Sequence, residues 1–393
     1  MRGHIRRRSK GSWELKFDLG RDPKTGKRKT RFRSFKGTKR QAEVALARLL
    51  SQANDGLYLD STKETVAQFF ERWDRDWAST NVGPKSLERY RQIVRLNIVP
   101  HVGAIPIQKL RAVHLSELYA MLLRHGRSRK TADVRELIPK GLAARTVGHV
   151  HRVLHRALGH AVKWGLLQQN AAANVDAPRV EATEIEILRE GDVQGLLEKL
   201  RGRSLYIIAV VGLASGMRRG EMLALRWRDV DFAAGRMHVE RSLEQTKAGG
   251  LRFKAPKTKR GRRMISIAPS AMTELRAHHR SQQERWLALG LGKVRDDALV
   301  FATWNGEPRT PNALSKDWSE TMAAFGMKIT LHALRHTHAS QLIAAGMDVV
   351  TISRRLGHAS PTITLAVYGH LFSNTDDRAA DIIEAAFSGS KKE

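Results

Sequence analysis

Four residues near the C-terminus have the types and the spacing that attack on a phosphodiester requires. In the stretch 331–372, His332 and Arg335 lie three residues apart, His358 follows a Leu-Gly pair, and Tyr368 comes ten residues later. Residues three apart lie on one face of a helix, so the first two side chains would lie side by side. The stretch predicts a site in which Tyr368 is a nucleophile and the other three residues serve the phosphate.

Cutting DNA without a metal ion needs a nucleophile, cations for the non-bridging oxygens and an acid for the departing 5′ oxygen. A tyrosine suits the first role because its phosphate ester resists water yet returns the phosphate to a DNA hydroxyl. Guanidinium groups stay charged and donate paired hydrogen bonds to phosphate, whereas a lysine can release a proton. A second arginine and a lysine must therefore come from elsewhere in the chain.

The composition favours a nucleic-acid partner. The 69 Lys and Arg against 39 Asp and Glu give a formal net charge of +30, although ribosomal, membrane-surface and heparin-binding proteins are basic too. The absence of cysteine excludes disulfides and cysteine-ligated zinc. No run of about 18 apolar residues and no signal peptide is present, so we expect a soluble, intracellular protein with no membrane partner.

Residues 1–57 are expected to form a DNA-binding domain with a small β-sheet and a helix. Residues 1–40 contain 16 Lys and Arg against 3 Asp and Glu, and apolar residues alternate with polar ones from Trp13 to Leu19. Thr38 and Gln41 predict a capping box before a helix that ends near Gly56. A solvated basic tail is the alternative. The candidate DNA contacts are Arg6, Arg7, Arg8, Arg31 and Arg33.

Residues 64–170 are expected to form a helical, core-site DNA-binding domain. An apolar stripe starts at Val66, and a long helix after residue 143 has an apolar side around Val147 and Leu154. The opposite side predicts contacts to the DNA backbone, with a merely solvated face as the alternative; its candidate residues are Arg145, Arg152 and Arg156. His151 and His155 lie four apart, but no carboxylate nearby supports a metal site.

Residues 171–187 are predicted to be a linker, and residues 188–393 a third, mostly α domain with a small antiparallel β-sheet. Strands are expected at 236–241, 251–255 and 263–267, the last two joined as a hairpin by 256–262. Residues 124–140 have no pattern and predict a loop. A C-terminal helix over 378–387 would hook onto a neighbouring protomer or pack in cis.

Three separated motifs resemble the tyrosine recombinase family, in particular phage-type integrases with an arm-binding N-terminal domain. The motif ASGMRRGEMLALRW at 214–227 is similar to the family's first arginine box, which implies a catalytic Arg218 supported by Glu221. APKTKRGRRMISI is similar to the lysine-bearing turn, which implies Lys257 as the general acid, with Lys259 as the alternative. LHALRHTHAS and the LGH and AVYGH motifs supply the other catalytic residues, which are His332, Arg335, His358 and Tyr368.

The resemblance implies a site-specific DNA recombinase that integrates or excises a phage or other mobile element through a 3′-phosphotyrosine intermediate. The implied fold is multidomain α+β, with a three-stranded N-terminal sheet plus helix, an all-α core-binding domain and a mixed catalytic domain. Four protomers would act on two duplexes carrying core and arm sites, without metal or other cofactor. A host DNA-bending protein and a directionality factor would be further partners, on the nucleoid in the bacterial cytoplasm.

Two alternatives share the fold or the chemistry. The first is a DNA-binding regulator that has lost catalysis, and the second is a relaxing topoisomerase of the type IB class. His332, His336 and His338 could suggest a metal cluster, but the expected ligand spacing is missing, so His336 and His338 are expected to pack or to support the site. The remaining cations beside the motifs are candidate contacts to the DNA backbone, namely Arg219, Arg262 and Arg263.

Overall fold

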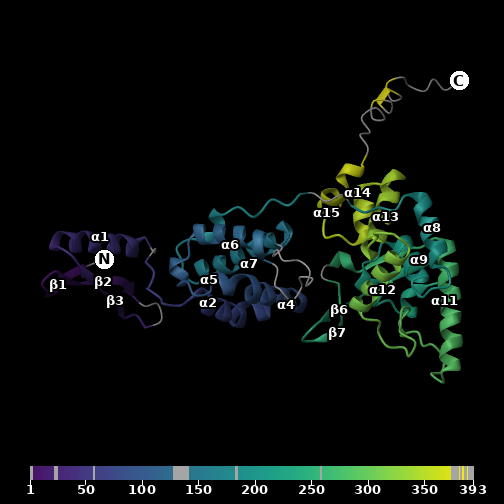
Figure 1. The fold of residues 1–393 in the computed structure, drawn as a ribbon, viewed down its shortest axis with the longest axis horizontal. Coiled ribbons are helices and arrows are strands. Elements are labelled where there is room, and N and C mark those ends of the chain that lie inside the picture. The colour runs from purple at the N-terminus through teal and green to yellow at the C-terminus, as the bar shows by residue number, and fades with distance from the viewer. Residues whose placement is uncertain are drawn as a thin grey trace. The chain divides into compact units, whose positions relative to one another are not determined.

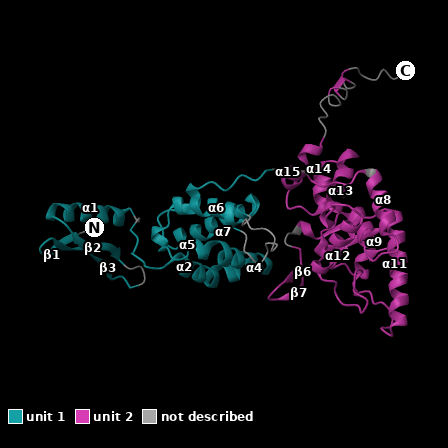
Figure 2. Ribbon diagram, in the orientation of Figure 1, with its two compact units in different colours: residues 1–181 teal, residues 182–393 magenta. Residues whose placement is uncertain are grey.

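The computed structural model describes residues 3–21, 25–55, 58–126, 141–181, 185–256 and 259–372, together with 380, 383, 384 and 387. The chain divides into two compact units, Met1–Glu181 and Ala182–Glu393 (Figures 1 and 2). The boundary falls within the predicted linker. In the described part of the chain, no helix is long and apolar enough to cross a membrane.

The first unit begins with the predicted sheet and helix. Strands β1 (Gly3–Ser9), β2 (Ser12–Arg21) and β3 (Arg28–Lys36) form an antiparallel sheet in that order. Helix α1 (Lys39–Asn54) begins with the predicted capping box, in which Thr38 accepts from the Gln41 N–H and the Gln41 side chain accepts from the Thr38 N–H. Leu15 and Phe17 on one face of the sheet are buried against α1.

The rest of the first unit is helical, as predicted. The longest helices are α6 (Ala112–His125) and α7 (Ala144–Lys163), whose apolar faces form one core with the aromatic stripe of α2. Two π-helical turns join consecutive α-helices: η1 lies between α2 and α3, and η2 lies between α4 and α5. The remaining elements are α2 (Val66–Trp73), η1 (Asp74–Ala78), α3 (Ser79–Asn81), α4 (Pro84–Ile93), η2 (Val94–Ile98), α5 (Val99–Val102), η3 (Ile107–Lys109) and η5 (Ala171–Asn174).

The second unit is built around α9 (Tyr206–Ser215), an apolar helix that is buried along nearly all its length. Helix α13 (Leu331–Ala344) packs against it, which joins two sequence motifs more than 100 residues apart (Figure 1). The other helical elements are α8 (Glu190–Leu200), α10 (Arg219–Met222), η6 (Trp227–Asp229), η7 (Lys259–Gly261), α11 (Pro269–Ala288), α12 (Pro311–Ala324), α14 (Val349–Leu356), α15 (Pro361–Tyr368) and η8 (Gly369–Leu371).

The strands of the second unit correct one prediction. Strands β4 (Val230–Asp231), β5 (Arg236–Val239) and β8 (Arg263–Ser266) form one small antiparallel sheet, while β6 (Ser242–Thr246) and β7 (Gly250–Lys254) form a separate ribbon. The predicted hairpin between 251–255 and 263–267 is therefore wrong. Strand β8 pairs with β5 because Met237 and Ile265 lie opposite each other in the core, whereas Leu251 and Phe253 of the ribbon stay exposed.

Two predicted segments lie wholly or largely outside the described residues. Residues 127–140 cover most of the predicted loop, and of the C-terminal helix only 380, 383, 384 and 387 are described. Ile383 and Phe387 within this segment are both exposed.

Candidate active site

One cavity of the second unit, of about 510 Å³, gathers the predicted catalytic residues. Its walls come from the start of α10, from α13, from the turn after α14 and from α15. Among its lining residues are Arg218, Glu221, His332, Arg335, His358 and Tyr368. Lys257 lies outside the described residues, as does the side chain of Lys259.

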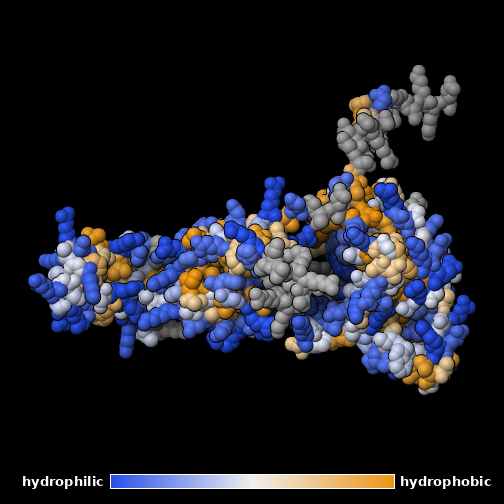
Figure 3. Space-filling model, viewed as in Figure 1, coloured by the Kyte–Doolittle hydropathy of each residue, from blue (hydrophilic) through white to orange (hydrophobic). Residues whose placement is uncertain are grey.

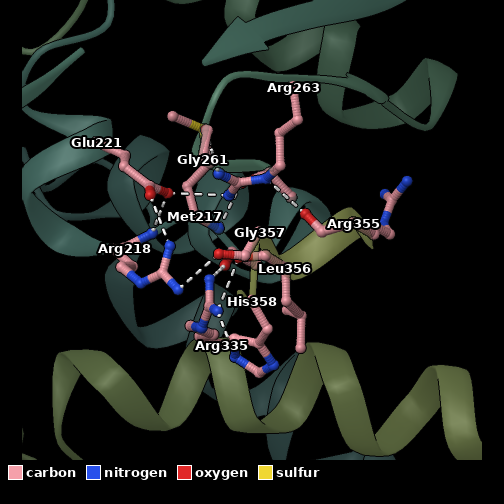
Figure 4. Close-up of polar contacts among 12 residues, drawn as sticks. Met217, Arg218, Glu221, Gly261, Arg263, Arg335, Arg355, Leu356, Gly357 and His358 are labelled. Carbon is pink, nitrogen blue, oxygen red and sulfur yellow. Dashed lines mark hydrogen bonds and ion pairs between the residues drawn. The ribbon is translucent and has the colours of Figure 1, made fainter. Parts of the chain in front are cut away.

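Arg335 is fixed at the centre of this cavity. It is 3% exposed and donates to the carbonyl oxygen of Gly216 at 2.6 Å. It also donates to the Leu356 carbonyl oxygen (2.8 Å) and to His358 Nε2 (2.9 Å), as Figure 4 shows. Burial lowers the pKa of Arg335 to about 9, which leaves the guanidinium charged at neutral pH. A guanidinium has five N–H donors, so bonds to the described residues leave part of this group available to a phosphate.

Arg218 precedes α10 and is held by a buried carboxylate. Glu221 accepts from the Arg218 backbone N–H (3.0 Å) and from its Nη1 (2.8 Å), and Arg218 Nη2 donates to the Gly357 carbonyl at 3.0 Å. The Arg218 side chain is 41% exposed, whereas that of Glu221 is 4% exposed. The exposed part of the Arg218 guanidinium can therefore bind a phosphate in the cavity while Glu221 and the Gly357 carbonyl hold the side chain in place.

Arg263, predicted to contact DNA, is instead buried beneath the site. Its side chain is 6% exposed and donates to Glu221 Oε2 at 2.9 Å and to the Arg355 carbonyl (Figure 4). Burial acts to raise the pKa of Glu221, but the charges and hydrogen bonds of Arg263 and Arg218 outweigh it, so the pKa is lowered. The DNA-contact prediction for Arg263 is wrong because its strand turns the side chain into the unit.

Two glycines let the backbone carbonyls reach the arginines. Gly216 ends α9 with φ of +63°, and a Cβ there would lie 2.6 Å from the His338 ring. Gly357 ends α14 with φ of +67°, and a Cβ there would lie 2.7 Å from Arg263 Nη1. Both positions require glycine, because a side chain would meet strain and a clash together.

His358 has partners for both ring nitrogens. Because Arg335 donates to Nε2, that nitrogen is the acceptor, and the proton therefore lies on Nδ1, 2.8 Å from Thr364 Oγ1. Burial, Arg335 and other nearby cations lower the pKa of His358 to about 4, so the ring is neutral at pH 7. Thr364 was not predicted from the sequence, because a threonine in an apolar helix belongs to no catalytic motif. Its position four residues before Tyr368, on the same helix face, is the one signal that could have indicated it.

Tyr368 ends α15 and is 1% exposed, although its ring lines the cavity. Its hydroxyl lies 2.8 Å from His336 Nδ1, and the His332 ring meets the His336 ring edge-on at 4.6 Å. Burial raises the pKa of Tyr368. Burial, with His336 and the nearby arginines, lowers the pKa of His332 to about 4. His336, which contacts the Tyr368 hydroxyl, is thus a residue that was expected from the sequence only to pack or to support the site.

The other residues beside the motifs have different environments. Arg219 is half-buried and donates to the Ser315 hydroxyl, whereas Arg262 is exposed. His338 is buried and bonded to the Leu213 carbonyl and to Arg355, as a packing residue would be. Lys254 of β7 also lines the cavity and pairs with Glu244.

The predicted contacts of the N-terminal sheet divide between its two faces. The register places Arg6 on the face opposite α1, where Arg8 pairs with Glu14. Lys16 and Phe32 of the same face lie beside each other, with the Lys16 Nζ 5.8 Å from the ring centroid. Arg7, Arg31 and Arg33 align with the residues that face α1, and Arg31 is paired with Asp60. The open face is therefore the better candidate for nucleic acid.

The predicted cations of α7 form a stripe along one side of the helix. Arg145, His149, Arg152 and Arg156 follow one another at intervals of three or four residues, and the three arginines are exposed. Arg156 donates to the Tyr90 hydroxyl and lies over the Trp77 ring. His151 of the same helix contacts the Tyr119 hydroxyl at 3.1 Å. Hydrophilic residues predominate on the face of this unit in Figure 3.

Two protein-family models and several known integrases match this chain. Residues 186–375 match the phage integrase family, and residues 65–123 match the phage integrase N-terminal SAM-like domain. The ICEBs1 integrase of Bacillus subtilis is 25% identical over 389 residues, covering 97% of this chain and 99% of the relative. A "Tyrosine recombinase XerC-like" protein of Caldanaerobacter subterraneus is 25% identical over 369 residues, covering 89% and 90%.

Solved structures share the fold. The Tn1549 transposon integrase in complex with transposon right end DNA has a TM-score of 0.66 and 20% identity, covering 82% of this chain and 99% of that chain. A lambda integrase dimer bound to a core site has a TM-score of 0.54 and 17% identity, covering 94% of both chains. With both phage integrase matches in their expected order and a tyrosine, two arginines and three histidines around one cavity, the chain belongs to the tyrosine recombinase family, as an integrase of mobile elements.

Proposed function

We propose that the chain cuts and rejoins DNA by forming a covalent bond between the Tyr368 hydroxyl oxygen and the phosphorus at a DNA 3′ end. The observation that carries this proposal is the convergence of Arg218, Arg335 and Tyr368 on one cavity from three separate elements. The cavity supplies a nucleophile and two cations for the same phosphate, which is the set that metal-free phosphoryl transfer requires.

Each residue takes one part of the reaction. Arg218 and Arg335 hold the non-bridging oxygens, His332 adds a hydrogen bond to them, and His358 positions Arg335 through Nε2. Glu221 orients Arg218 from beneath the site. As the Tyr368 oxygen bonds to phosphorus, the bond to the 5′ oxygen breaks, and Lys257 gives that oxygen a proton, with Lys259 as the alternative donor. The reverse reaction with the 5′ hydroxyl of another strand completes the exchange.

Covalent trapping on a nicked suicide substrate tests this chemistry. Wild type should form a protease-sensitive protein–DNA adduct, and Tyr368→Phe, which lacks only the hydroxyl oxygen, should form none. An undiminished adduct from the Phe variant would remove Tyr368 as the nucleophile. A chain that binds the site yet forms no adduct in either version would instead be a DNA-binding regulator.

The domain roles form the second part of the proposal. Residues 1–57 bind arm sites, 64–170 bind the core site, 188–393 cut and rejoin it, and 171–187 are a linker, in a tetramer that works on the bacterial nucleoid with a host bending protein and a directionality factor. Solved relatives include a lambda integrase dimer on a core site and a tetramer on a Holliday junction, which supports this assembly.

Deleting residues 1–57 tests the division between arm and core sites. Binding to arm sites should weaken, while covalent capture on a core-site substrate should persist, because none of the described residues that line the cavity belongs to this segment. Gel-shift assays on separate arm and core duplexes measure both effects. Loss of core capture together with arm binding would contradict the proposed roles.

A further inference from the structure

The Tyr368 hydroxyl lies against a histidine that the sequence motifs leave without a chemical role. His336 Nδ1 is 2.8 Å from the hydroxyl oxygen, and the two rings are 5.6 Å apart at 63°. His336 directly follows Arg335 on α13, so the helix turns it by about 100° from that arginine. Arg335 therefore reaches the carbonyls of Gly216 and Leu356, while His336 meets the nucleophile on α15.

We propose that His336 is the base that takes the proton of Tyr368 during cleavage. The step deepens the proposed function and rests on it, because it presumes that Tyr368 is the nucleophile. The hydroxyl proton passes to His336 Nδ1 as the oxygen bonds to phosphorus, and the departing 5′ oxygen takes its proton from the lysine of the turn. On rejoining, the proton returns from His336 to the tyrosine oxygen, so no proton is gained or lost at this pair.

The other two histidines of the cavity are less suited to this step. His358 is engaged by Arg335 on one ring nitrogen and by Thr364 on the other. His332 meets His336 edge-on, and the hydroxyl's hydrogen-bonding partner among the described residues is His336. His332 lines the cavity together with Arg335, and the proposed function assigns its N–H to a phosphate oxygen.

The protonation states fit a transfer that accompanies the attack. Burial and Arg335 lower the pKa of His336, so the ring is neutral at pH 7 and has a nitrogen lone pair for the proton. Burial raises the pKa of Tyr368, although Arg335 acts against it, so the hydroxyl keeps its proton in the free protein. The proton moves only when the new oxygen–phosphorus bond makes the hydroxyl more acidic, which is general base catalysis.

The test is His336→Asn in the full chain, measured as the single-turnover rate of adduct formation on the suicide substrate. The Asn amide oxygen lies near the place of Nδ1 and can accept the tyrosine hydrogen bond, but it cannot take a proton at neutral pH. We expect the rate to fall about 10²-fold or more, with DNA affinity and melting temperature unchanged. A rate within threefold of wild type would show that a hydrogen bond suffices and would overturn the proposal.

A second substrate separates the two ends of the reaction. When sulfur replaces the bridging 5′ oxygen, the leaving group needs no proton, so a variant defective in the general acid is rescued. The His336→Asn defect should persist on this substrate, whereas rescue would assign His336 to the leaving group and overturn the proposal. His336→Gln, examined in the same way, gives an independent reading if the Asn variant is unstable.

Failure of this step is distinguishable from failure of the proposed function. If Tyr368→Phe forms no adduct but His336→Asn reacts like wild type, only the base assignment is wrong. If Tyr368→Phe still forms an adduct, another residue is the nucleophile and both conclusions fall.

Discussion

Arg335 in the cavity and Arg156 on α7 both use their guanidinium groups within the chain, but with different partners and burial. Arg335 is 3% exposed and is fixed by two backbone carbonyls and His358. Arg156 is exposed and contacts the Tyr90 hydroxyl and the Trp77 ring. The buried arrangement of Arg335 suits a phosphate that must be held in one geometry during a reaction. The exposed arrangement of Arg156 suits contacts to a DNA backbone, which do not need a single fixed geometry.

The substitution Arg335→Lys is expected to have the largest effect and tests the difference between Arg335 and Arg156. An ammonium keeps the charge but cannot span Gly216, Leu356 and His358, so a phosphate would lose its fixed donors. We expect adduct formation on the suicide substrate to fall about 10²- to 10³-fold. Arg156→Lys is the matched control and should change that rate less than about threefold, because the predicted role of Arg156 is binding to the DNA backbone. Equal effects of the two substitutions would refute the distinction.

Glu221→Gln examines the ion pairs beneath the cavity. Removing one partner of a buried pair leaves Arg263 uncompensated, so the free energy of unfolding should fall by about 3 kcal/mol at pH 7. The folded-state pKa of Glu221 is lowered from 4.5, so this contribution is fully present above that value and is lost as pH falls through the lower folded value.

Urea unfolding of wild type and Glu221→Gln at pH 7 and pH 3 measures this difference. The gap between the two proteins should narrow at the lower pH. Asp60→Asn removes an exposed carboxylate paired with Arg31 and is the control, with an expected change below about 1 kcal/mol. A gap that does not depend on pH would mean that Glu221 acts by packing rather than by charge.

Arg156→Ala sharpens the description of the α7 stripe. Losing one phosphate contact should weaken core-site DNA severalfold for every sequence and reduce the slope of log K against log salt by about 0.9. Arg156→Lys keeps the charge and should keep the slope, while any loss of affinity reports the contact with Trp77. Binding titrations from low to moderate salt provide both numbers. An unchanged slope in the Ala variant would place Arg156 off the DNA.

The smallest effect is expected for Arg31 of the N-terminal sheet. Arg31→Ala should change arm-site affinity less than about twofold, because the side chain lies at the α1 side and is paired with Asp60. Arg6→Ala, on the face of the sheet opposite α1, should weaken arm-site affinity severalfold. Gel shifts on an arm-site duplex compare the two, and the reverse order would mean that the opposite side of the sheet meets DNA.

Much of the architecture was predictable because its signals are local. The capping box at Thr38 and the apolar stripe that starts at Val66 both follow from short-range patterns, and each is confirmed. The family motifs named Arg218, Arg335 and Tyr368, and the packing of α13 on α9 explains how distant motifs reach one cavity.

The remainder depends on long-range contacts that a sequence pattern does not specify. The predicted pairing of β8 with the strand at 251–255 was wrong, because strand pairing depends on which residues pack together in the core. Arg262 and Arg263 look alike in the sequence, yet the alternation of a strand exposes one and buries the other. The contact of His336 with Tyr368 joins residues 32 apart and could be seen only in three dimensions.

The carbonyl groups that hold the arginines are the ends of helices. Gly216 closes α9, and Leu356 and Gly357 close α14, where aligned peptide dipoles leave roughly half a negative charge at each C-terminus. Fractional charges thus steady two cations, and Glu221 is the one carboxylate among the described lining residues. An arriving phosphate consequently competes with dipoles rather than with a ring of acids, and the electric field of the cavity stays attractive to DNA.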